Sequence, residues 1–215
     1  MKKFISLFCA VIIAMAASLP VYASGVDNNA STAKNKTDLQ IWQEDKQEVQ
    51  NELNRRLALH KNEIFHETFD YTTSNGNTIT VDFGTAREGV STNASGSGST
   101  PIDGPGNFYT WFEYSNFFLG TGKIRAQVDY TVTEIVNGAP SLKARSCSLT
   151  ATPPQGCRKD DQDFSITVDT FILVRAEGYI TFINENSHTA INLYPDIQVV
   201  GDNSPPNTLD WYWSC

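Results

Sequence analysis

Apolar residues early in the chain recur with the period of a helix. Four of them are spaced by seven, four and four positions, which places them on one face. They are Trp42, Val49, Leu53 and Leu57. Thr37 and Gln40 precede this stripe at the spacing of a capping box. We expect an amphipathic helix over residues 38–62, either packed on the main domain or binding a partner.

After the helix the period becomes two, which indicates strands. The dipeptide Asn75-Gly76 separates the first two strands and suggests a two-residue turn. Such a turn would send the two apolar sets to opposite faces, whereas a loop of three residues beginning at Ser74 places Tyr71 opposite Ile79. We therefore predict the longer loop, with Gly76 in the left-handed conformation of a bulge.

Alternation of apolar and polar residues dominates the rest of the chain. Residues 124–133 form the clearest half-buried strand, and 164–168, 178–183 and 191–199 repeat the pattern, the last around Pro195. The proline indicates an edge strand or a bulge. Turn residues separate these strands and no helical stretch intervenes. The pattern predicts a mainly β fold, an antiparallel β-sandwich or open barrel with one N-terminal α-helix.

Residues 86–106 lack a strand pattern and are rich in Gly, Ser, Thr and Pro. We expect a long flexible loop there. The hairpin before the loop would be marginal alone, which predicts a single β domain over 63–215 and not two domains. Residues 24–37 are small and polar and are expected to form a disordered leader.

The first residues have the layout of a secretory signal. Lys2 and Lys3 precede an apolar run at 4–19, and small residues end at Ala23. This pattern predicts a signal peptide over 1–23 and a secreted, extracellular product without a membrane span. The layout resembles that of small secreted bacterial proteins, but no segment is diagnostic of one family, so no residue role is carried over.

Composition adds two exclusions. The 215 residues are 40% hydrophobic, which is ample material for a core and excludes a chain that is disordered throughout. Removing residues 1–23 takes two of the 16 basic groups and leaves 14 against 24 acidic ones, a net charge of about −10. An acidic chain without a basic cluster argues against a nucleic-acid partner.

Three cysteines would remain after export, namely Cys147, Cys157 and Cys215. An exported chain favours oxidation, so we predict a Cys147–Cys157 disulfide and a free Cys215 that could link a covalent dimer. Pairing of Cys215 with either of the other two is the alternative. The scattered spacing disfavours zinc.

Catalytic motifs are scarce. His60, Glu63 and His66 follow neither order of the zinc-protease motif, and their common face is doubtful. No glycine-rich stretch has the pattern of a nucleotide site. We expect no catalytic residue, no metal and no cofactor.

Carboxylates give two weaker signals. Asp160, Asp161 and Asp163 lack the glycine and distal glutamate of a calcium loop, which favours a solvated charged turn. Glu113 and Asp129 on neighbouring strands could form the acidic pair of a glycosidase. A secreted, glycan-directed hydrolase is therefore one alternative function, and an envelope-associated structural protein is another.

The most informative segment is 108–118, in which seven of 11 residues are aromatic. One interpretation is a central strand buried on both faces. The other is an aromatic platform for an extracellular glycan or a protein or peptide ligand, since Tyr and Trp combine apolar area with a hydrogen-bonding group. The candidate binding residues are Tyr109, Trp111 and Phe117, extended by Trp211 and Trp213. The favoured function is non-enzymatic ligand binding.

Overall fold

A computed structural model describes residues 36–60, 63–89, 100–102, 104–117, 121–136, 139–201 and 209–214. Within them lie one helix and 11 strands. The elements are α1 (Asp38–Leu57), β1 (Glu63–Thr72), β2 (Thr78–Arg87), β3 (Thr100–Pro101), β4 (Gly106–Asn116), β5 (Gly122–Val136), β6 (Ala139–Thr152), β7 (Cys157–Thr170), β8 (Leu173–Asn184), β9 (Ala190–Leu193), β10 (Asp196–Gly201) and β11 (Leu209–Ser214).

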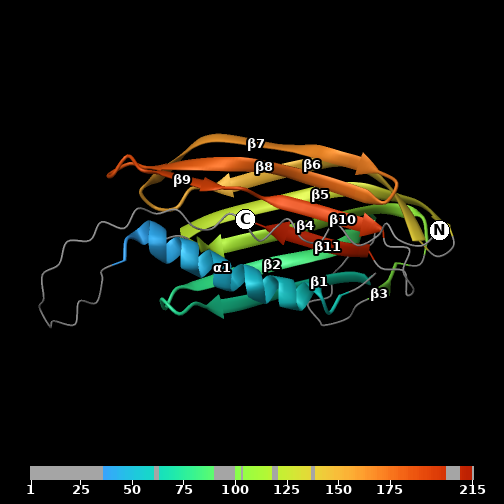
Figure 1. Ribbon diagram of the computed structural model, residues 1–215, viewed down its shortest axis with the longest axis horizontal. Coiled ribbons are helices and arrows are strands. Elements are labelled where there is room, and N and C mark those ends of the chain that lie inside the picture. Colours follow the sequence, from blue (N-terminus) through green and yellow to red (C-terminus); the bar gives the residue numbers. More distant parts are fainter. Residues whose placement is uncertain are drawn as a thin grey trace, which may run out of the picture. The chain divides into compact units, whose positions relative to one another are not determined.

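The strands form two antiparallel sheets. The six-stranded sheet has the order β3-β1-β2-β4-β5-β6, and the five-stranded sheet has the order β11-β10-β8-β7 with β9 also paired to β8. Neither sheet closes into a barrel. Figure 1 shows α1 and the five-stranded sheet in front of the six-stranded sheet. The predicted β-sandwich with one helix is confirmed.

The helix begins and packs as its sequence predicts. Thr37 and Gln40 form the reciprocal capping box, with hydrogen bonds of 3.2 and 3.0 Å. The apolar stripe is buried, and Trp42 contacts Phe117 at 5.3 Å between ring centroids. Because this apolar face is buried, it stabilises the main domain, which confirms the interpretation of a helix packed on that domain. The helix ends at Leu57, earlier than predicted.

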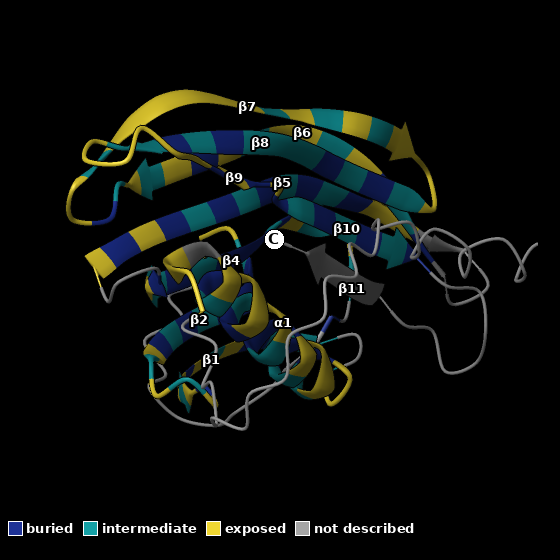
Figure 2. Cartoon of the chain, turned by 60° about the vertical axis from the view of Figure 1, so that its left-hand side comes forward, coloured by how far each residue is buried: buried dark blue, intermediate teal, exposed yellow. Residues whose placement is uncertain are grey.

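Side-chain alternation places one shared core between the layers. Figure 2 shows buried and more exposed residues alternating along β5 and β8. We call the side of the six-stranded sheet that faces α1 and the second sheet its inner face, and the opposite side its outer face. Inner residues such as Phe83, Phe112 and Val128 are completely buried. The outer face carries mostly polar side chains, and the candidate site lies there.

The first hairpin has the predicted register. Tyr71 pairs with Ile79 and Phe69 pairs with Val81. Gly76 has a φ of 85°, in the left-handed region that glycine adopts without strain. The loop of three residues is confirmed.

Other boundaries differ from the predictions. The expected loop at 86–106 is partly strand, because β2 continues through Arg87 and β3 begins at Thr100. The expected charged turn at Asp160–Asp163 lies inside β7. Because β7 is the last strand of its sheet, its charges are those expected of an edge strand that must not pair with other chains. Pro195 separates β9 from β10 and accepts a backbone hydrogen bond of 3.1 Å from Gly178.

The predicted Cys147–Cys157 disulfide is absent, because both residues are free thiols. The Cys147 Sγ donates to the carbonyl oxygen of Phe164 at 3.4 Å. Phe164 follows Cys157 by seven residues of β7, a strand length of roughly 20 Å. A disulfide tolerates about 7 Å between Cα atoms, so this arrangement excludes the bridge.

Some predictions fall outside the described residues. These are the signal peptide, all but the last two residues of the leader, and Cys215. Among the described residues, no helix has both the length and the apolar character needed to cross a bilayer.

Candidate ligand-binding face

The outer face is built from residues that the strand register brings into rows. One row runs Thr68, Asp82, Glu113 and Arg125 across β1, β2, β4 and β5. The next row on the same face runs His66, Gly84, Trp111 and Gln127. Directly opposed side chains in such rows lie about 5 Å apart, so the two rows form one continuous polar surface with an indole at its centre.

Trp111 occupies the space that Gly84 leaves empty. A Cβ atom on Gly84 would lie 2.8 Å from the Cη2 atom of Trp111 and 2.3 Å from the carbonyl oxygen of Phe65. The indole therefore extends across β2 toward β1, where its centroid lies 5.4 Å from that of His66. Glycine is required at this position because the ring and a neighbouring backbone both approach it closely.

Asp82 holds the indole in this orientation. Its Oδ1 accepts a hydrogen bond of 2.6 Å from Trp111 Nε1. Its Oδ2 lies 2.6 Å from His66 Nε2 and accepts a 2.9 Å bond from the hydroxyl of Thr68. Burial raises the pKa of the Asp82 carboxyl, but the hydrogen bonds from these three partners outweigh burial and hold the pKa below its ordinary value. The carboxylate is therefore ionised at neutral pH and fixed by several donors.

The structure separates the two aromatic candidates on this face. Trp111 is on the outer face as the parity predicts, yet it is only 4% exposed. Tyr109 lies next to it, with the ring centroids 5.4 Å apart, and is half-buried. On the other side the guanidinium of Arg125 lies over the indole, 5.4 Å from its centroid. Tyr109 thus offers the more accessible ring, and Trp111 lies beneath its neighbours.

The other candidate aromatic residues do not join this pair. Phe117 is completely buried, between Trp42 and Phe182. Trp211 and Trp213 lie on β11, which belongs to the five-stranded sheet, and their side chains lie outside the description. The outer face therefore contains Tyr109 and Trp111 but not the whole predicted set.

The acidic pair proposed for a hydrolase is too widely spaced. Glu113 pairs in register with Arg125, which lies four residues from Asp129. Four residues of strand span roughly 13 Å, more than the 5–10 Å that a glycosidase uses. Asp82 lies opposite Glu113, but both of its carboxylate oxygens already accept hydrogen bonds, Oδ1 from Trp111 and Oδ2 from Thr68.

The polar residues of the face were missed in the sequence search for a site. His60 and His66 do not share a face, because His60 stacks on the inner residue Phe65 and binds Glu67, whereas His66 faces outward to Asp82. Alternation of β1 and β2 placed His66 and Asp82 on the polar face. Their contact depends on the register, which the hairpin prediction already contained.

The described residues contain no group of three or more His, Cys, Asp or Glu side chains that could hold a metal ion. No protein-family model, curated protein or solved structure matches the chain, so the outer face is interpreted from its own geometry.

Proposed function

We propose that this protein is an exported, non-enzymatic binding protein, and that its ligand binds the outer face of the six-stranded sheet around Tyr109 and Trp111. The observation that carries the proposal is the fixed indole. A tryptophan on the polar side of a sheet is oriented by a 2.6 Å hydrogen bond to a carboxylate that has two further partners. Sites that bind ligands hold their recognition groups in place through such supporting contacts.

The chemistry of the surface supports an extended polar ligand. Tyr109 supplies an aromatic ring with a hydroxyl, and its neighbours Asp129, Gln127 and Arg125 supply acceptors and donors on the adjacent strand. Gln127 donates to Asp129 at 2.8 Å, so these groups are themselves ordered. Glycans and extended peptides both present alternating polar groups that such a surface can pair with.

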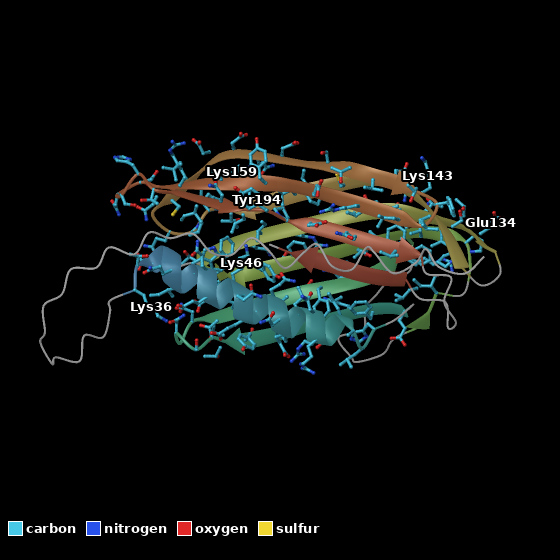
Figure 3. The ribbon with its side chains drawn as sticks, viewed as in Figure 1. Lys36, Lys46, Glu134, Lys143, Lys159 and Tyr194 are labelled. Carbon is cyan, nitrogen blue, oxygen red and sulfur yellow. The ribbon has the colours of Figure 1, made fainter. Side chains whose placement is uncertain are left out.

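Tyr109 provides the sharpest test, because replacing the buried Trp111 would also disturb packing. Tyr109→Ala is compared with Tyr194→Ala, which removes a 59% exposed tyrosine at the β9–β10 junction, labelled in Figure 3. Binding is measured on glycan and peptide arrays, with thermal melts of both variants. We expect the first change to cost about 2 kcal/mol of binding, roughly 30-fold in affinity, and the second to cost none. Equal losses in the two variants, or no ligand for the wild type, would contradict the proposal.

A further inference from the structure

The guanidinium of Arg125 lies over the face of the Trp111 indole, where the cation of a ligand could bind. Its guanidinium carbon lies 5.4 Å from the ring centroid, in the range of a cation–π contact. The Arg125 side chain is 35% exposed, whereas Trp111 is 4% exposed. Arg125 therefore shields an aromatic surface that would otherwise be more accessible on this face.

The polar contacts of Arg125 with Gln127 and Glu113 are long. Its Nη2 donates to Gln127 Oε1 at 3.2 Å, and its Nη1 lies 3.8 Å from Glu113 Oε2. The same glutamate has a closer cation, because Lys123 Nζ lies 2.7 Å from Glu113 Oε1. Movement of Arg125 would leave Glu113 paired with Lys123, so displacement of Arg125 leaves no carboxylate without a partner.

The charge on the outer face favours a cationic ligand. Across β1, β2, β4 and β5 the rows that carry Trp111 and its neighbours contain four carboxylates and two cations. The carboxylates are Asp70, Asp82, Glu113 and Asp129, and the cations are Lys123 and Arg125. The whole chain has a net charge of −8, so its wider field has the same sign.

We propose that the ligand is an extended peptide bearing arginine or lysine, and that one of its basic side chains displaces Arg125 from the indole. This inference rests on the proposed function and specifies its ligand class. A guanidinium already bound there demonstrates that the chemistry fits the indole and the edge formed by Glu113 and Gln127. Extended peptides present alternate side chains about 7 Å apart on one face, so further basic residues can reach Asp129 or Asp70. Arg125 is then an intramolecular competitor of the ligand.

The experiment removes Arg125 and asks whether the affinity for a basic peptide rises or falls. Arg125→Gln is tested with Arg158→Gln, which removes an exposed arginine of β7 in the other sheet and changes the net charge equally. The probes are a ten-residue peptide alternating Arg and Ser, its Glu and Gln counterparts, and neutral and acidic oligosaccharides. Binding is measured by calorimetry, and melts check that each variant folds.

We expect Arg125→Gln to raise affinity for the Arg peptide by about two- to five-fold, the worth of an exposed cation–π contact. Arg158→Gln should leave that affinity unchanged. An equal rise in both variants would reduce the effect to net charge and overturn the inference. Tighter binding of an oligosaccharide or the Glu peptide by the wild type, weakened by Arg125→Gln, would make Arg125 a ligand contact. That result would overturn the inference and leave the proposed function standing, whereas no binding of any probe would remove both.

Discussion

Asp82 and Trp111 are joined by a 2.6 Å hydrogen bond although they are not register partners. Asp82 pairs with Glu113, and Trp111 pairs with Gly84. The bond therefore runs diagonally between two rows of the outer face. It exists because the missing side chain at Gly84 lets the indole lie across β2 and direct its N–H toward Asp82. The orientation of Trp111 depends on one donor, one acceptor and one glycine.

Trp111→Phe tests the hydrogen bond separately from the packing. The substitution keeps an aromatic ring but leaves Asp82 without one of its donors. We expect a loss of about 1–3 kcal/mol in the free energy of unfolding, the usual cost of an unpaired, partly buried polar group. Trp111→Ala should cost more, about 3–5 kcal/mol, because it also leaves a cavity. Urea unfolding measures both, and an unchanged free energy of unfolding in Trp111→Phe would show that the hydrogen bond contributes nothing.

Gly84→Ala tests the space beneath the indole. The new Cβ atom would lie 2.3 Å from the Phe65 carbonyl oxygen, a backbone atom that cannot rotate away. We expect a destabilisation of about 1–3 kcal/mol and altered tryptophan fluorescence as the ring shifts. Gly104→Ala is the matched control, since nothing lies within 4 Å of a Cβ there. Similar melting temperatures for the two variants would refute the close approach at Gly84.

Regular spacing of apolar residues made the helix and the first hairpin predictable. The stripe from Trp42 to Leu57 and the pairing of Tyr71 with Ile79 follow from periods that nothing interrupts. β6 was not predicted, because a bulge at Arg145 changes which parity faces the core. Leu142 and Leu149 are both buried although one is even and the other odd.

Hydrophobicity alone does not predict burial at Phe171 and Ile172. Both residues form the exposed turn between β7 and β8, and Phe171 is 68% exposed. Only part of the candidate site could be predicted from the sequence. Parity placed Tyr109 and Trp111 outward, but the cover by Arg125 depends on the pairing of β4 with β5, which no local pattern reveals.

Leu53 and Leu59 provide a matched test of helix packing. Leu53 is completely buried beneath α1, whereas Leu59, just beyond the helix, is 68% exposed. Leu53→Ala should cost about 2–5 kcal/mol, lowering the melting temperature by roughly 4–20 °C for a chain of this size. Leu59→Ala should change stability by about 0.5 kcal/mol or less. Equal shifts would mean that α1 does not pack on the sheet as described.

Cys147 and Cys157 should resist alkylation in the folded protein. Burial raises the pKa of both thiols, aided at Cys147 by the nearby charges of Asp129 and Asp163 and at Cys157 by Glu185. Because the thiolate is the reactive form, iodoacetamide should modify them slowly at about pH 8 and rapidly in denaturant. Peptide mapping measures the extent of modification. Recovery of a peptide in which the two cysteines are linked would contradict the separation of the thiols along β7.

Glu52 gives the chain a specific dependence of stability on acid. Hydrogen bonds from Arg55 and Arg56 at 2.7–2.8 Å lower its pKa from 4.5 to about 2. The unfolded chain therefore takes up a proton at higher pH than the folded chain does. The resulting stabilisation is fully present above about pH 4.5 and is lost as the pH falls toward 2.

Urea unfolding between these pH limits measures the slope. We expect Glu52→Gln to reduce the loss of stability on acidification, by less than the full linkage value because solvent screens these surface charges. Glu134→Gln, at an exposed position of β5, is the control and should leave the slope close to that of the wild type. High salt should diminish the difference between wild type and Glu52→Gln, because screening weakens the interaction of Glu52 with both arginines. An unchanged slope in Glu52→Gln would show that these arginines do not favour the ionised form of Glu52 in the folded protein.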